Sequence, residues 1–230
     1  MHIPITGQFI NLFAALQLLI SFAMLSQRRV VSLINLFSAQ GLVLGISTLI
    51  VAYSTGQKHL VYSALLTITL KVIVLPFLLH RLVERLHIRW EVETLINIPT
   101  TMIVGIGLVI FAFNVAMPIS QLSGTIIRST LGIALACILL SFLMMLTRRK
   151  ALPQVIGFLS MENSLLFAAI SATYGMPMVV EFGVALDLLI GSLILGMFFF
   201  QVRETFDSLD LQHMERLKDG KNKREVSRES

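Results

Sequence analysis

The chain has 230 residues, of which 56% are hydrophobic and only 13% are charged, whereas roughly 25% of the residues of an ordinary soluble domain are charged. A mean hydropathy of +0.84 excludes a soluble globular protein, whose surface needs far more polar side chains. The net charge of +5 would suit nucleic acid, but the positions of the basic residues indicate membrane topology instead. The single cysteine, Cys137, excludes an intramolecular disulfide and a thiolate metal cluster.

Long apolar segments divide the sequence into seven predicted transmembrane helices, because about 20 apolar residues in a helix cross the hydrocarbon core. Helices are expected throughout, since backbone groups in lipid must be satisfied within each segment. The first segment lacks a basic region before it and is followed by Arg28 and Arg29, so we expect a retained helix rather than a cleaved signal peptide. The predicted spans are 9–25, 31–53, 60–79, 98–117, 125–146, 155–174 and 176–200.

Basic residues are distributed unequally between the loops. With seven spans, all but Lys58, Lys71 and Arg128 of the 18 lysines and arginines lie on one side of the membrane. Lys58 and Arg128 lie on the other side, and Lys71 is inside a span. Because basic loops stay in the cytoplasm, this asymmetry predicts an external N-terminus and a cytoplasmic C-terminus.

The order of the segments indicates an all-α membrane protein with an internal duplication. Residues 1–79 and 125–200 each contain an apolar helix, a helix with a central polar group and a helix with a central charge. In this comparison Gln40 corresponds to Glu162, and the single linking helix predicts a parallel repeat. Residues 80–124 are predicted to form an interfacial amphipathic segment and the linking helix, and 201–230 a cytoplasmic tail that ends in disorder.

Four ionisable residues lie inside the apolar segments: Lys71, Glu162, Glu181 and Asp187. A charge at the bilayer centre costs at least about 2.5–3.5 kcal/mol on insertion scales, and such residues are functional by default. Glu181 lies nearer the outer face than the other three, which are about halfway through their spans. Glu181 and Asp187 are also about 9 Å apart along the axis and about 240° apart around it, so they cannot share one face. We predict a proton-translocation site with Glu162 and Asp187 as carriers, Glu181 as relay or alternative carrier, and Lys71 as a modulating charge.

Two further features support this site. Pro76 has no N–H to give the carbonyl of Val72, so the helix either opens beside Lys71 or kinks. Gly41 and Gly45 form a G-x-x-x-G pattern typical of close helix packing, next to the polar Gln40.

The sequence shows no nucleophile constellation, phosphate-binding loop or metal-ligand spacing, so we expect no catalytic centre and no cofactor in this chain.

A structural interpretation of the same residues stays open. Lys71 and one acid could form a buried ion pair that only fixes helix register, or the charges could lie on water-filled crevices without function. Buried pairs often fail to repay their desolvation, which favours a functional role.

Several of these motifs resemble hydrogenase-4 component E, a membrane subunit of group 4 NiFe hydrogenase and formate hydrogenlyase-type complexes. The resemblance covers nearly the whole chain and rests on residues 67–76, 157–163, 180–187, 208–211 and 217–220. It implies a multi-pass protein in the cytoplasmic membrane of a bacterium or archaeon. It also implies antiporter-like neighbouring subunits and a peripheral arm whose Ni-Fe and Fe-S centres are on other chains.

The last three predicted spans are also similar to the K subunit of respiratory complex I and the C subunit of Mrp antiporters, which carry two intramembrane glutamates. Glu162 matches the first. Glu181 matches the second by local sequence and Asp187 matches it by depth, so both remain candidates. The resemblance implies a subunit that contributes to proton (or sodium) translocation in a redox-driven complex. The alternatives are a subunit of an Mrp-type cation/proton antiporter and a structural membrane spacer without ion transfer.

Overall fold

The computed structural model describes residues 5–56, 58–85, 94–120 and 125–173, and beyond these only 183, 185–186, 189–193 and 196. Residues Met1–Leu188 form one compact unit, which contains every helix described below. These helices are α1 (Ile5–Ser26), α2 (Val30–Thr55), α3 (Lys58–Ile68), η1 (Thr69–Val74), α4 (Leu75–Arg85), α5 (Ile98–Ser120), α6 (Thr125–Thr147) and α7 (Ala151–Thr173).

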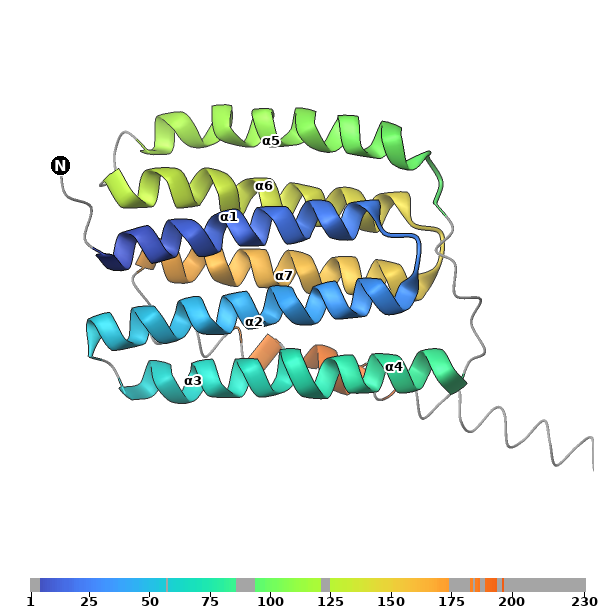
Figure 1. Ribbon diagram of the computed structural model, residues 1–230, viewed down its shortest axis with the longest axis horizontal. Coiled ribbons are helices and arrows are strands. Elements are labelled where there is room, and N and C mark those ends of the chain that lie inside the picture. Colours follow the sequence, from blue (N-terminus) through green and yellow to red (C-terminus); the bar gives the residue numbers. More distant parts are fainter. Residues whose placement is uncertain are drawn as a thin grey trace, which may run out of the picture. The chain divides into compact units, whose positions relative to one another are not determined.

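Within the described residues, six helical stretches are long and apolar enough to cross a membrane. They confirm the first six predicted helices, and the third of them is a continuous rod made of α3, η1 and α4 (Figure 1). The predicted seventh span, 176–200, and the tail lie largely or wholly outside the described residues. Four statements therefore stay predictions: the seventh span, the orientation of the chain in the membrane, the internal duplication, and the division of the chain into parts ending at residues 79, 124 and 200. The stretches are Gln8–Ser26, Val30–Ser54, Leu60–Glu84, Ile98–Pro118, Thr130–Thr147 and Ala151–Ser171.

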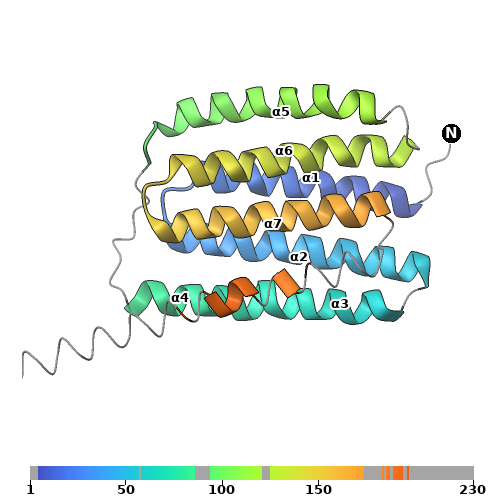
Figure 2. The same ribbon diagram turned by 180° about the vertical axis from the view of Figure 1, so that it is seen from behind.

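Four helices form a closed ring, in which α1 contacts α2, α2 contacts α7, α7 contacts α6 and α6 contacts α1. Helix α5 packs outside this ring against α6 and α1, and the rod of α3, η1 and α4 packs against α2 on the opposite side (Figures 1 and 2). Helix α5 is accordingly the most exposed span, with large apolar side chains such as Ile103 (70% exposed) directed outward. Polar side chains inside the ring are shielded from the surroundings.

The rod lies very close to α2 because two glycines face it. A Cβ atom added to Gly41 would lie 2.9 Å from the Cβ of Lys71, and one added to Gly45 would overlap the side chain of Ile68. These contacts confirm the packing role predicted for the G-x-x-x-G pattern. They also bring the backbone of α2 against the segment that carries Lys71.

The predicted interfacial segment begins differently from the expectation. Leu82 and Val83 belong to α4, which continues the third span without a break to Arg85, and both side chains are buried. Residues 86–93, which include Trp90, lie outside the described part of the chain.

A buried arginine joins the helices at the end of the ring where α6 meets α7. Arg148 is 1% exposed, and its Nη2 donates to the carbonyl of Leu25 at 2.9 Å and to that of Met24 at 3.3 Å. A cation placed there satisfies the last carbonyls of α1 and suits the negative end of the helix dipole. Burial lowers the pKa of Arg148 to about 10, so it stays protonated at neutral pH. The N–H of Leu95 donates to the carbonyl of Thr147 at 2.8 Å, which attaches the segment before α5 to the same end.

Replacing Gly45 by alanine should destabilise the protein. An extra methyl group in a tight contact costs about 1–3 kcal/mol, which exceeds the gain of roughly 0.5–1 kcal/mol from removing a glycine from a helix. Gly107→Ala in α5 is the matched control, because a Cβ there meets nothing within 4 Å. Thermal unfolding in mild detergent should give a lower midpoint for Gly45→Ala and an unchanged or higher one for Gly107→Ala. Equal midpoints would contradict the packing role of Gly45.

Candidate functional site

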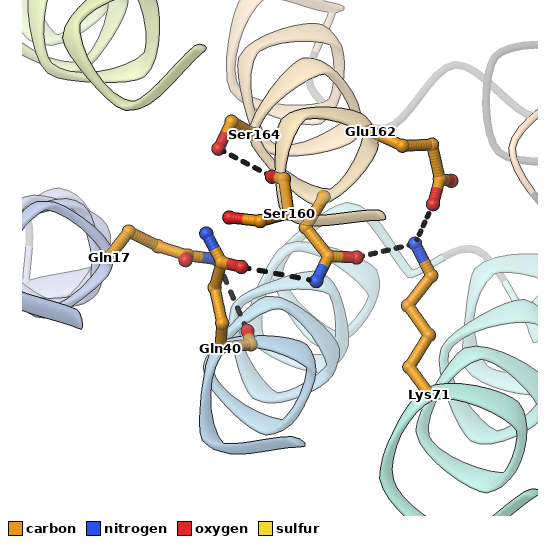
Figure 3. A network of polar contacts seen from close by, with 7 residues as sticks. Gln17, Gln40, Lys71, Ser160, Glu162 and Ser164 are labelled. Carbon is orange, nitrogen blue, oxygen red and sulfur yellow. Dashed lines mark hydrogen bonds and ion pairs between the residues drawn. The ribbon is translucent and has the colours of Figure 1, made fainter. Parts of the chain in front are cut away.

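Two of the four predicted site residues lie together in the interior. Nζ of Lys71, on η1, is 2.8 Å from Oε2 of Glu162, on α7, and the side chains are 0% and 3% exposed (Figure 3). Both residues lie near the middle of their spans, Leu60–Glu84 and Ala151–Ser171. The structure thus brings together opposite charges that are 91 residues apart in the sequence.

Lys71 also has a neutral hydrogen-bond acceptor. Its Nζ donates to Oδ1 of Asn163 at 2.6 Å, and Asn163 is fully buried. The ammonium therefore lies between a carboxylate oxygen and an amide oxygen from two consecutive residues of α7. Asn163 was not among the predicted site residues. A second polar residue directly after Glu162 in an apolar run could have indicated that it belongs to the site.

A chain of amides and one hydroxyl group continues from Asn163 across α2 to α1. Nδ2 of Asn163 donates to Oε1 of Gln40 at 3.5 Å, and Nε2 of Gln40 donates to Oγ of Ser21 at 3.4 Å. Oγ of Ser21 donates to the backbone carbonyl of Gln17 at 2.9 Å. In return, Nε2 of Gln17 donates to the backbone carbonyl of Gln40 at 3.3 Å. Figure 3 shows Gln17 and Gln40 directed toward each other from their two helices. The prediction named Gln40 and missed Ser21 and Gln17.

The backbone of η1 is widened around Lys71. Thr69–Val74 is a π-helix, in which a main-chain N–H bonds a carbonyl five residues back instead of four. Pro76 cannot donate to the carbonyl of Val72, and Oγ of Ser38 on α2 donates to it instead, at 3.3 Å. The predicted opening of the helix beside Lys71 is therefore confirmed, and the carbonyl that it frees has a partner on the neighbouring helix.

Two serines on α7 form contacts one half-turn from Glu162. Oγ of Ser160 lies 2.8 Å from Oγ of Ser141 on α6. Oγ of Ser164 donates to the carbonyl of Ser160 at 2.9 Å (Figure 3). The first contact connects α6 to α7, the second lies within α7, and neither involves the charged pair.

The other predicted carriers, Glu181 and Asp187, lie outside the described residues. Within the part of the chain that is described, no three histidine, cysteine, aspartate or glutamate residues lie close enough together to hold a metal ion.

The ion pair is energetically coupled because it lies in a medium of low polarity. Removing one partner of a buried pair leaves an uncompensated charge and costs about 3–5 kcal/mol. A proton that neutralises Glu162 likewise changes the environment of Lys71. The stability of this contact therefore depends on the charge of both side chains.

Comparisons with known proteins agree with a membrane subunit. The chain is 28% identical over 209 residues to uncharacterized protein Rv0085 of Mycobacterium tuberculosis, covering 90% of this chain and 95% of that protein. It is 24% identical over 215 residues to hydrogenase-4 component E of Escherichia coli K12, and the match covers 93% of this chain and 99% of that protein. No protein-family model and no solved structure matches the chain. The chain is thus distantly homologous to hydrogenase-4 component E over most of its length.

Single and double substitutions should show the coupling of the pair. We expect Lys71→Met and Glu162→Gln each to destabilise the protein by about 3–5 kcal/mol. The double variant should lose clearly less than the sum, because neither charge is then left alone. Unfolding of the purified chain in detergent measures all three. Strictly additive losses would mean that the two charges do not stabilise each other.

Proposed function

We propose that this chain is a membrane subunit of a redox-driven ion-pumping complex of the group 4 hydrogenase type. In that complex it would contribute Lys71 and Glu162, together with Asp187 and Glu181, to proton translocation. The Ni-Fe and Fe-S centres that drive the reaction would lie on partner chains in a peripheral arm. Antiporter-like membrane subunits would be its neighbours.

The observation that carries the proposal is the Lys71–Glu162 contact in the middle of two spans. Fixing the register of helices in a membrane requires neither a lysine nor a carboxylate, because small residues and neutral polar side chains achieve it at lower desolvation cost. A titratable pair at that depth suits a group that takes up and releases protons. Distant homology to hydrogenase-4 component E supports the type of complex.

In the proposed cycle, Glu162 carries the proton and Lys71 sets the electrostatic cost of each state. With Glu162 ionised, the pair is neutral overall and the 2.8 Å contact is stable. When Glu162 takes up a proton, its attraction to Lys71 weakens and the neighbourhood gains a positive charge, which favours release of that proton from Glu162. Asp187 or Glu181 would accept it, and Glu162 would return to its ionised form.

Neutralising the carriers should uncouple pumping from the redox reaction. In the assembled complex we expect Glu162→Gln to lower redox-driven proton uptake by inverted membrane vesicles about tenfold or more, because an amide cannot titrate. Asp187→Asn should act similarly if it is the second carrier. Proton uptake is divided by the amount of assembled complex, determined on native gels.

Glu84→Gln is the matched control, since Glu84 is an exposed carboxylate at the end of the third span and should pump normally. Undiminished pumping by Glu162→Gln with intact redox activity would contradict the proposal. Poor assembly with normal pumping per complex would identify a structural spacer. Co-purification with monovalent-cation antiporter subunits and no hydrogenase subunits would favour an Mrp-type antiporter.

A further inference from the structure

Three buried amides lie in contact with one another between Lys71 and helices α2 and α1. Asn163 contacts Lys71 directly, Gln40 contacts Asn163, and Gln17 lies against Gln40. All three are buried, at 1% exposure or less. The chain of contacts is therefore enclosed by the ring of helices and linked to the ion pair at one end.

Four hydrogen bonds lead away from the ammonium: Lys71 donates to Asn163, Asn163 to Gln40, Gln40 to Ser21, and Ser21 to the backbone of Gln17. A fifth, from Nε2 of Gln17 to the backbone carbonyl of Gln40, runs the other way. Asn163 and Gln40 thus present their oxygens toward the ammonium and their NH2 groups away from it. Aligned hydrogen bonds polarise one another, and this alignment stabilises a positive charge at Lys71.

A primary amide accepts at its oxygen and donates from its nitrogen, and it does not titrate. To pass a proton along, Asn163 would have to gain one at Oδ1 and lose one from Nδ2. It would then be left as the unstable imidic acid, which must revert before the next transfer. Hydroxyl, carboxyl and water groups recover by simple rotation, whereas an amide does not.

We infer that the chain Asn163–Gln40–Ser21 anchors the Lys71 ammonium and carries no proton, so that proton exchange at the pair does not pass through α1 and α2. Asn163 is a positioning residue that keeps Lys71 bonded when Glu162 is protonated. Gln40 orients Asn163, and Ser21 orients Gln40. The inference rests on the proposed function for its statement about proton exchange, and on the contacts alone for the anchor.

The anchor is tested on the purified full-length chain by double-mutant cycles between Lys71→Met and each position of the chain. An anchor predicts a coupling that falls with distance from Lys71. The coupling with Lys71→Met is expressed as a factor in the unfolding equilibrium constant. We expect a factor of about ten for Asn163→Leu, about two to three for Gln40→Leu, and less than about two for Ser21→Ala. The coupling is largest at Asn163 because hydrogen bonds to ionised groups are roughly twice as strong as neutral ones. Asn163→Ala replaces Asn163→Leu if leucine prevents folding, and Asn163→Gln should restore most of the coupling. No coupling at Asn163 would overturn the anchor.

Proton exchange is tested by pumping per assembled complex, with Glu162→Gln as the reference. An anchor predicts a loss that falls with distance from Lys71, strong for Asn163→Leu, partial for Gln40→Leu and smallest for Ser21→Ala. A proton wire would instead be interrupted equally at all three positions, and equal losses would overturn the inference. Normal pumping by Glu162→Gln would contradict the proposed function and, with it, the statement about proton exchange. The double-mutant cycles would still test whether Asn163, Gln40 and Ser21 anchor Lys71.

Discussion

The interior of this protein is organised by the requirement that opposite charges buried in hydrocarbon neutralise each other. An isolated ion there costs several kcal/mol, so Lys71 needs an acid beside it, and in this structure that acid is Glu162. The contact at 2.8 Å fixes the rotation of α7 and of the rod about their axes. Gly41 allows α2 to approach Lys71 to within van der Waals contact, so that α2 passes beside the pair without separating it.

Association of the helices depends on close packing and polar contacts, because lipid tails are as apolar as leucine side chains. Close packing occurs at Gly41, Gly45 and Gly157, where an added Cβ on Gly157 would lie 3.2 Å from the backbone N of Met145. Polar contacts occur at two levels. The mid-span network joins α1, α2, α7 and η1, and Arg148 joins α1 to the turn between α6 and α7. The ring is therefore tied at its middle and at one end.

The sequence contained enough information for the first six helices and for the depth of Lys71 and Glu162, because both depend only on position along an apolar run. It did not determine which acid Lys71 would meet, since that depends on the rotation of helices that are far apart in the chain. Pro76 predicted an open turn, but the hydroxyl group of Ser38 that satisfies the freed carbonyl comes from another helix. Arg148 was counted among the basic loop residues, because in the sequence it cannot be distinguished from its neighbours Arg149 and Lys150. In the structure its side chain is only 1% exposed.

Asn163 gives the buried Lys71 ammonium a second strong acceptor beside Glu162. The Lys71 ammonium has three N–H donors, and a buried pair repays its desolvation only when further hydrogen bonds satisfy the donors that the carboxylate leaves. Asn163 meets that need in a structural pair as well as in a functional one. At this site the amide oxygen of Asn163 lies even closer to Nζ than the carboxylate does, at 2.6 Å. On the proposed function this arrangement is useful, because Lys71 keeps a strong hydrogen bond while Glu162 exchanges its proton. The cost of breaking the pair is then lower than for a lysine with no other partner, as the proposed function requires of a group that exchanges protons at this depth.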